Sequence, residues 1–134
     1  MDFIAAADND GRAGDIGVIT DVVLRLKRGE RENIERVIRE NAEKRAATQP
    51  SGRSAGSVFK AADGVPAGLL IDGAGLKGTR IGGAYVSRRH ANFILNDGAA
   101  AFRDVTELIE LIRKKVYNVY GVKLEPEIRI IWNE

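Results

Sequence analysis

The groups best suited to chemistry lie in two short segments of this sequence. Lys60 ends the run Gly-Ser-Val-Phe-Lys, and its ammonium and the backbone N–H groups around Gly56 are suited to contact an anion, such as a diphosphate or a carboxylate. Ser57 lies in the same run, and Glu127 lies in a Glu-Pro-Glu segment near the end of the chain. From pattern alone, Ser57 lines a tight Gly-Ser turn, and Glu127 is a surface carboxylate paired with Arg129 or a lysine.

Five further residues are weaker candidates. Gly82 and Gly83 permit a close backbone approach, either to a ligand or merely within a turn. Gln49, Arg88 and His90 are polar side chains that could bind a substrate, although a single histidine at a strand end is more often structural. With one histidine and no cysteine, the chain offers neither disulfides nor the ligand set of a multi-histidine or thiolate metal site.

Composition narrows the class of protein. The chain has 134 residues, a net charge of +2 and 30% charged residues, which fits one compact domain with a short extension. The basic residues are dispersed and aromatic residues are few, so no nucleic-acid partner is expected. No apolar run is long enough to cross a membrane and no signal peptide is recognisable, so we expect a cytoplasmic protein without a membrane partner.

Two segments have the periodicity of long helices. Residues 30–46 repeat apolar side chains at helical spacing, and residues 104–120 do so more strongly. Asp104 and Glu107 are expected to form an N-terminal capping pair for the second helix, and Gly121 to end it.

The other elements are expected to be short. The strand candidates are residues 17–27, 56–60, 79–86, 92–96 and 122–132, and a short helix is expected to begin at Pro66. A small sheet packed by two long helices predicts an α+β fold.

Three groups of motifs, taken in this order and spacing, are highly specific. They are residues 54–60 (SAGSVFK), the series running from 67–72 (AGLLID) through 74–78 and 81–87 to 90–94 (HANFI), and residues 124–131 (LEPEIRII). Together they resemble the C-terminal domain of the MurB-type UDP-N-acetylenolpyruvoylglucosamine reductases. The resemblance covers roughly residues 17–131. It implies that residues 17–47 are a strand of a preceding domain and a crossover helix, and that 48–134 are the substrate-binding domain. Residues 1–16 show little periodicity and are expected to be a loop or frayed terminus.

The resemblance also implies an activity. The family uses NADPH and FAD to reduce the enolpyruvyl ether of UDP-N-acetylglucosamine to UDP-N-acetylmuramate during peptidoglycan synthesis. Ser57 matches the serine that protonates the enolate-like intermediate, and Glu127 matches the glutamate at the carboxylate end of the substrate. Such a carboxyl group needs a bound proton or an arginine partner beside an anion. The candidate substrate-binding residues beside this pair are Lys60, Gly56, Gln49, Gly82, Gly83 and His90.

The sequence departs from the family pattern in two ways. Ala61 and Ala62 stand where the family often has Asn or Arg and then Pro, so Ala61 cannot make a side-chain contact to the diphosphate. The family's flavin-binding segment precedes everything that resembles it here, so we expect no cofactor to bind this chain alone. A flavin domain or subunit is then the expected partner beside the UDP-sugar, and strand exchange in a homodimer is a further expectation. The alternative function is a non-catalytic binding or assembly module.

Overall fold

The structure is a computed structural model that describes residues 21–130, and the chain divides into two units, Met1–Val37 and Ile38–Glu134. The strand expected over residues 17–27 lies partly outside the described residues. Its described part, 21–27, is not a strand and is exposed. A strand is completed by hydrogen bonds to a neighbouring strand, and residues 21–27 pair with none of the four described strands. The assignment of 17–47 to a preceding domain stays a prediction.

The first long helix is confirmed as α1 (Arg31–Thr48). Its apolar residues recur at helical spacing, but none of its residues is buried. Its large apolar side chains are exposed, namely those of Ile34, Val37 and Ile38. Pro50 follows the helix, and proline disfavours the helical conformation in the residue before it. The helix therefore forms from local preferences, without burial of a side chain among the described residues.

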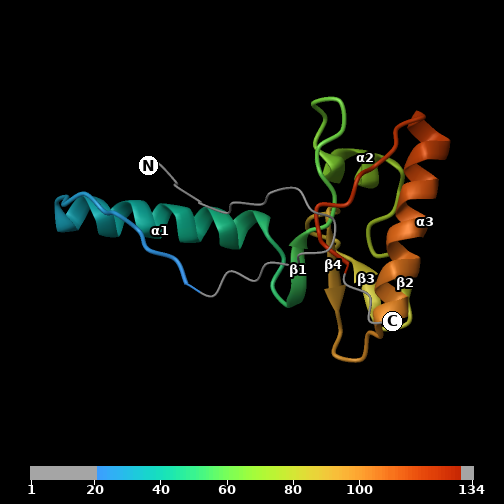
Figure 1. The fold of residues 1–134 in the computed structure, drawn as a ribbon, viewed down its shortest axis with the longest axis horizontal. Coiled ribbons are helices and arrows are strands. Elements are labelled where there is room, and N and C mark those ends of the chain that lie inside the picture. The colour runs from blue at the N-terminus through green and yellow to red at the C-terminus, as the bar shows by residue number, and fades with distance from the viewer. Residues whose placement is uncertain (1–20, 131–134) are drawn as a thin grey trace. The chain divides into compact units, whose positions relative to one another are not determined.

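The centre of the second unit is an antiparallel sheet of four strands. In space the order is β1 (Arg53–Ser57), β4 (Phe93–Asn96), β3 (Ala84–Val86) and β2 (Arg80–Ile81), as Figure 1 shows. The short helix expected at Pro66 is α2 (Ala67–Gly73), and the second long helix is α3 (Phe102–Tyr120), which contacts β2 and β3. The predicted α+β class is confirmed.

The core lies between α3 and one face of the sheet. Its buried side chains come from α3 and the segment after it, from the segment after β1, from alternate positions of the strands, and from α2 and the loops: Leu108, Ile109, Ile112, Val116, Leu124, Val58, Phe59, Ala84, Val86, Ile94, Ala67, Ile71, Leu76 and Ala91. Burial of one large aliphatic side chain contributes roughly 1.5–3 kcal/mol. The four buried residues of α3 thus explain why its sequence pattern was the more regular of the two.

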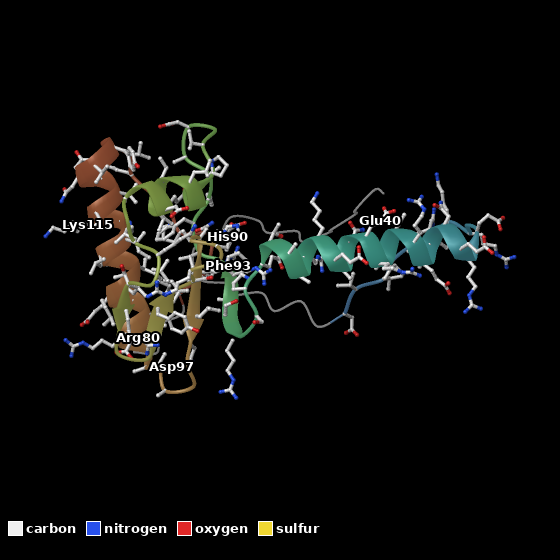
Figure 2. All side chains as sticks on the ribbon, turned by 180° about the vertical axis from the view of Figure 1, so that it is seen from behind. Glu40, Arg80, His90, Phe93, Asp97 and Lys115 are labelled. Carbon is white, nitrogen blue, oxygen red and sulfur yellow. The ribbon has the colours of Figure 1, made fainter. Side chains whose placement is uncertain are left out.

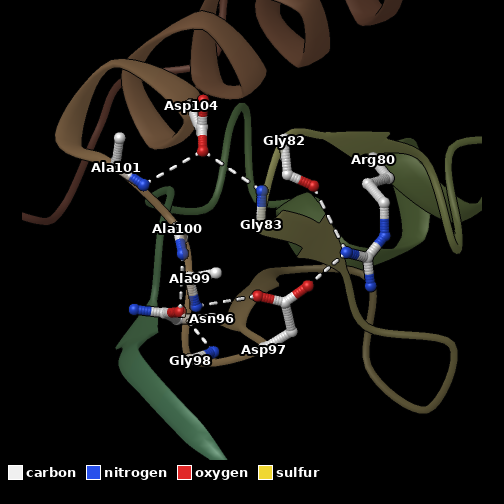
Figure 3. Close-up of polar contacts among 10 residues, drawn as sticks. All are labelled: Arg80, Gly82, Gly83, Asn96, Asp97, Gly98, Ala99, Ala100, Ala101 and Asp104. Carbon is white, nitrogen blue, oxygen red and sulfur yellow. Dashed lines mark hydrogen bonds and ion pairs between the residues drawn. The ribbon is translucent and has the colours of Figure 1, made fainter.

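The Gly82–Gly83 pair forms a tight turn where the sheet meets the start of α3 (Figure 3). The expected single strand over 79–86 is therefore wrong: it is a hairpin of β2 and β3. The Asp104 carboxylate accepts hydrogen bonds from the N–H groups of Gly83 (3.1 Å) and Ala101 (3.0 Å). A Cβ atom on Gly82 would overlap this carboxylate, and one on Gly83 would overlap the backbone of Ala100. Glycine is required here by packing.

The predicted capping pair at the start of α3 is corrected by the same contact. Asp104 is the third residue of the helix, and its carboxylate reaches back to the N–H of Ala101, the N-terminal cap. Glu107 instead pairs with Arg103 on the exposed face of the helix at 2.6 Å. The spacing of three residues between acceptor and cap was right, but the helix begins one turn earlier than expected. Gly121 ends the helix at a φ of 70°, as predicted.

The segment after α3 is not the expected strand over residues 122–132. In its described part, Pro126 forms one isolated antiparallel bridge with Phe59, and the remaining residues are irregular. Proline carries no N–H, so it cannot donate to a continuous ladder. The segment nevertheless lies beside the residues that follow β1, and this brings the two predicted catalytic positions into neighbouring segments.

Candidate functional site

A one-residue bulge in β1 determines how Ser57 is presented. Ser54 pairs with Leu95 and Ser57 pairs with Phe93, so three steps along β1 match two steps along β4. Gly56 lies within the bulge at a φ of 84°, a conformation that glycine adopts without strain. Ser57 is the last residue of β1 and is half-buried. The Gly-Ser pair therefore shapes the backbone and also places a hydroxyl at the end of the strand.

The peptide groups after Ser57 tie three distant parts of the chain together. The N–H of Val58 donates to the carbonyl of Asn92 at 2.9 Å, and the carbonyl of Val58 accepts from the N–H of Glu127 at 2.8 Å. The buried side chain of Asn92 binds both the N–H (3.0 Å) and the carbonyl (2.8 Å) of Phe59. Ser57 and Glu127 are thereby fixed on adjacent segments by backbone contacts. We call residues 57–60, 92 and 125–127 the Ser57–Glu127 bridge.

The side chains of Ser57 and Glu127 themselves have no hydrogen-bond or ion-pair partner among the described residues. Glu127 is exposed, and neither Arg129 nor a lysine pairs with it in this part of the chain. A hydroxyl that makes no internal hydrogen bond is available to donate a proton to a bound ligand, and a carboxyl group can accept one or donate one. The site therefore offers two oxygen groups on rigid, neighbouring backbone.

Lys60 is engaged by the residue beside Pro126. Its ammonium lies 2.5 Å from the Glu125 carboxylate, and both side chains are more than half exposed. Most backbone donors near Gly56 are also occupied, since the Gly56 N–H is directed at the Ser54 hydroxyl, and the N–H of Lys60 bonds to the Glu125 carbonyl. An anion at this place would have to compete with Glu125 for the ammonium. The predicted anion-binding role of Lys60 and Gly56 stays a prediction.

His90 contacts the bridge at Asn92 and lines a hollow of about 330 Å³ between α2 and the segment before β4. Figure 2 labels His90 beside Phe93, with which it makes an edge-to-face ring contact at 4.8 Å. The Nδ1 atom of His90 accepts the N–H of Asn92 at 3.3 Å, which leaves Nε2 to donate when the ring is neutral. We call this the His90 hollow. Its lining includes Gly68, Lys77, Asp72, Arg89 and Ala91.

The other predicted site residues are dispersed. Gln49 is exposed directly after α1, and Gly82 and Gly83 form the turn against Asp104. The structure gives these two glycines a packing role, and their predicted contact with substrate stays a prediction. Ala61 is exposed just beyond Lys60.

No group of ligands for a metal and no helix able to cross a membrane occurs among residues 21–130. The expectation that no flavin binds this chain alone stays a prediction. The diphosphate of a flavin binds to a glycine-rich loop or to free N–H groups at a helix start. The α2 helix follows Pro66, the start of α3 is occupied by the Asp104 carboxylate, and the first turn of α1 carries Glu32.

Comparison with known proteins identifies the family. The family model described as UDP-N-acetylenolpyruvoylglucosamine reductase, C-terminal domain, matches residues 48–131. This chain belongs to that family. The family match includes every predicted site residue, from Gln49 through Glu127.

Relatives of this reductase family agree over most of the chain. The UDP-N-acetylenolpyruvoylglucosamine reductase of Alkaliphilus oremlandii is 46% identical over 118 residues, which are 87% of this chain and 39% of that protein. The reductase of Syntrophobacter fumaroxidans is 51% identical over 100 residues, which are 74% of this chain and 29% of that protein. The crystal structure of the Thermus caldophilus reductase (MurB) superposes with a TM-score of 0.63 at 42% identity, covering 77% of this chain and 37% of that one. The chain thus spans between 29% and 39% of the length of these relatives.

Sequence reasoning missed two residues that hold the site in place. Asn92 is buried, and its side chain binds the backbone of Phe59 on both sides. Asp104 fixes the Gly83 turn. The sequence signal for Asn92 was a single amide side chain directly before the apolar residues that begin at Phe93. An amide buried at such a position needs hydrogen-bond partners, which indicates a structural role.

Proposed function

We propose that this chain supplies the substrate-binding and proton-donating part of a UDP-N-acetylenolpyruvoylglucosamine reductase. The observation that carries the proposal is the Val58 peptide, which hydrogen-bonds to both Asn92 and Glu127 and so fixes Ser57 and Glu127 on adjacent segments. Family membership through residues 48–131 supports the same reaction. NADPH and FAD serve the whole reductase, and the flavin binds in the part of the relatives that lies beyond this chain's match.

Ser57 is proposed as the proton donor. Addition of hydride to the vinyl carbon of the enolpyruvyl ether leaves negative charge on the neighbouring carbon and on the carboxylate of the substrate. The Ser57 hydroxyl gives its proton to that carbon, which forms the new C–H bond. Serine is a weak acid, but an enolate is basic enough to accept its proton when the hydroxyl is held in place. The bulge at Gly56 supports that placement, and no partner among residues 21–130 competes for the hydroxyl.

Glu127 is proposed to act at the carboxylate end of the enolate. Its side chain is exposed and unpaired among the described residues, so it is accessible to a ligand. Beside a carboxylate it must bind as the protonated acid or share a cation, because two adjacent anions repel each other. The nearest ion pair, Lys60 with Glu125, provides a cation on the same bridge.

The nucleotide part of the UDP-sugar is proposed to bind in the His90 hollow. Lys77 is held there by Asp72 at 2.6 Å, and Arg89 adds a second positive charge. The Nε2 group of His90 adds a hydrogen-bond donor. A volume of about 330 Å³ suits part of a nucleotide sugar. The absence of a polar side chain at position 61 predicts weaker binding of the diphosphate than a polar residue would give.

Calorimetric titration of the chain with UDP-N-acetylglucosamine and with its enolpyruvyl ether tests the proposal. We expect saturable binding that favours the ether, because only the ether carries the carboxylate near Glu127. Ser57→Ala should bind the ether within about twofold of the unchanged protein, yet lower the reductase rate about 10²–10⁴-fold once a family flavin domain is added. Glu127→Gln should remove the preference for the ether.

Two results would overturn this proposal. One is equal binding of the two ligands, which would indicate that the bridge does not contact the enolpyruvyl group. The other is a Ser57→Ala protein with undiminished reductase rate. Absence of any heat at millimolar ligand would favour the alternative, a binding or assembly module that keeps the fold without the reaction.

A further inference from the structure

A second hollow, of about 480 Å³, opens on the sheet face opposite the core. Tyr85 and Leu95 are cross-strand partners on β3 and β4, and both line it. Three arginines, Arg80, Arg88 and Arg89, also line it, and no acidic residue does. We call this the Arg88 hollow. Its size falls within the range of small-molecule sites, and its lining is strongly positive.

The backbone that carries two of the arginines is fixed by a buried serine. Ser87 is 1% exposed, and its hydroxyl accepts hydrogen bonds from the N–H groups of Arg89 (3.1 Å) and His90 (3.2 Å). Neighbouring residues of a straight strand point to opposite faces. The bend after Ser87 instead lets Arg88 and Arg89 line the same hollow.

The three guanidinium groups differ in how much of their hydrogen-bonding capacity is free. Arg80 lies over the Tyr85 ring at 4.8 Å and pairs with Asp97, so its charge is largely neutralised. Arg89 donates through Nε to the carbonyl of Ala47 at 3.2 Å, which fixes the group and leaves its two terminal nitrogens. Arg88 has no hydrogen-bond or ion-pair partner among the described residues.

Arg88 is nevertheless positioned. Its guanidinium lies against the backbone of Gly78, where a Cβ atom would be 3.0 Å from the central carbon of the group. Gly78 has a φ of 79°, so glycine is favoured at this turn for two reasons. A planar cation held against a glycine and exposed to solvent on its other side presents its donors in a defined direction.

We propose that the Arg88 hollow is a second anion site, which binds a small ligand with two adjacent phosphate groups. Each free guanidinium can bind the oxygens of one phosphate through two parallel hydrogen bonds. Arg88 and Arg89 follow each other in the chain and line one hollow, so their ligand is a diphosphate group more readily than a single phosphate. The proposal does not rest on the proposed reductase function, although Arg89 also lines the His90 hollow.

Arg89 couples the two hollows, since its side chain lines both of them. A diphosphate that engages Arg89 in the Arg88 hollow occupies the terminal nitrogens that the His90 hollow would otherwise use. The second site would then lower the affinity of the first for an anionic ligand. This is a coupling between sites through one shared side chain, and it is reciprocal.

Titration of the chain with inorganic pyrophosphate, followed by backbone amide chemical shifts, tests the site directly. We expect saturable shifts centred on Gly78 and on residues 85–89. Arg88→Gln should weaken binding at least tenfold. Arg88→Lys keeps the charge but loses the planar fork, so it should weaken binding several-fold. The matched control is Lys115→Gln, which removes one positive charge from the exposed side of α3 (Figure 2) and should change affinity less than twofold.

Lys77→Gln separates this proposal from the reductase proposal. Lys77 lines the His90 hollow and not the Arg88 hollow, so this variant should weaken binding of the UDP-sugar and leave the pyrophosphate shifts at residues 85–89 unchanged. Equal effects of Arg88→Gln and Lys115→Gln would show that only net charge matters and would overturn the site. Shifts confined to the His90 hollow, or no saturable shift, would also overturn it.

Discussion

We call the turn at Gly82 and Gly83, together with Ala101 and Asp104, the Gly83–Asp104 corner. This corner and the Ser57–Glu127 bridge use polar groups in opposite ways. At the corner, the Asp104 carboxylate receives two backbone N–H groups, so its hydrogen-bonding capacity serves the fold. On the bridge, the backbone of Val58, Phe59 and Glu127 is hydrogen-bonded, while the side chains of Ser57 and Glu127 have no partner among the described residues. Polar groups that are already paired hold structure, and polar groups that a rigid backbone leaves unpaired are available to a ligand.

The largest effect is expected at the corner. Gly83→Ala should lower the free energy of unfolding by about 3 kcal/mol, because the new methyl group would overlap the backbone of Ala100, which cannot move as a side chain can. Urea denaturation measures the change. Gly29→Ala is the control: there the new atom would be 3.4 Å from the end of Ile34, an ordinary contact, and we expect a change within about 0.5 kcal/mol. Equal stability of the two variants would contradict the conclusion that packing requires glycine at position 83.

A smaller effect is expected from the support of the bridge. Asn92→Ala should cost about 2 kcal/mol, because it leaves the buried N–H and carbonyl of Phe59 without partners. Ser57→Ala is the matched change on the same bridge. Its stability should stay within about 0.5 kcal/mol of the unchanged protein, because the Ser57 hydroxyl has no hydrogen-bond partner in residues 21–130. Thermal unfolding of both proteins would show the difference. A destabilised Ser57→Ala protein would mean that the hydroxyl has a structural role.

The smallest effect is a pH dependence near the corner. The Arg80 guanidinium, followed by the Ala99 N–H, holds the pKa of the Asp97 carboxyl below its usual value of 3.8. A carboxyl group whose pKa is lowered by folding stabilises the fold above its unfolded-state pKa, and that contribution disappears as the pH falls through the folded-state value. The stability difference between the unchanged protein and Asp97→Asn should therefore shrink between about pH 5 and pH 2. A difference that does not change with pH would contradict this.

The two long helices and the family of this chain were predictable from the sequence. The apolar stripe of 104–120 is regular because four of its residues are buried in one core, and the specific motifs carried the family before any geometry was known. The absence of a strand over 122–132 was not predictable from periodicity. Its apolar residues alternate as in a strand (Val122, Leu124 and Ile128), but the segment forms only one bridge, at Pro126.

Pairing across long sequence separations was also beyond local patterns. The Gly82–Gly83 turn was recognised as a close approach, but its neighbour is Asp104, 21 positions from Gly83. Lys60 was expected to be free for an anion, and its ion pair with Glu125 joins residues 65 positions apart. Periodicity describes which side of an element is apolar, and it carries no information about which distant side chain lies opposite.

The bulge in β1 constrains how this segment can change during evolution. Ser54 and Ser57 face Leu95 and Phe93, which lie two positions apart on β4, so removing one residue between them would leave these pairings possible and abolish the bulge. Ser57 would then end a regular strand, without the left-handed turn at Gly56 that now precedes it. Inheritance must therefore preserve both the extra residue of this short segment and the glycine within it.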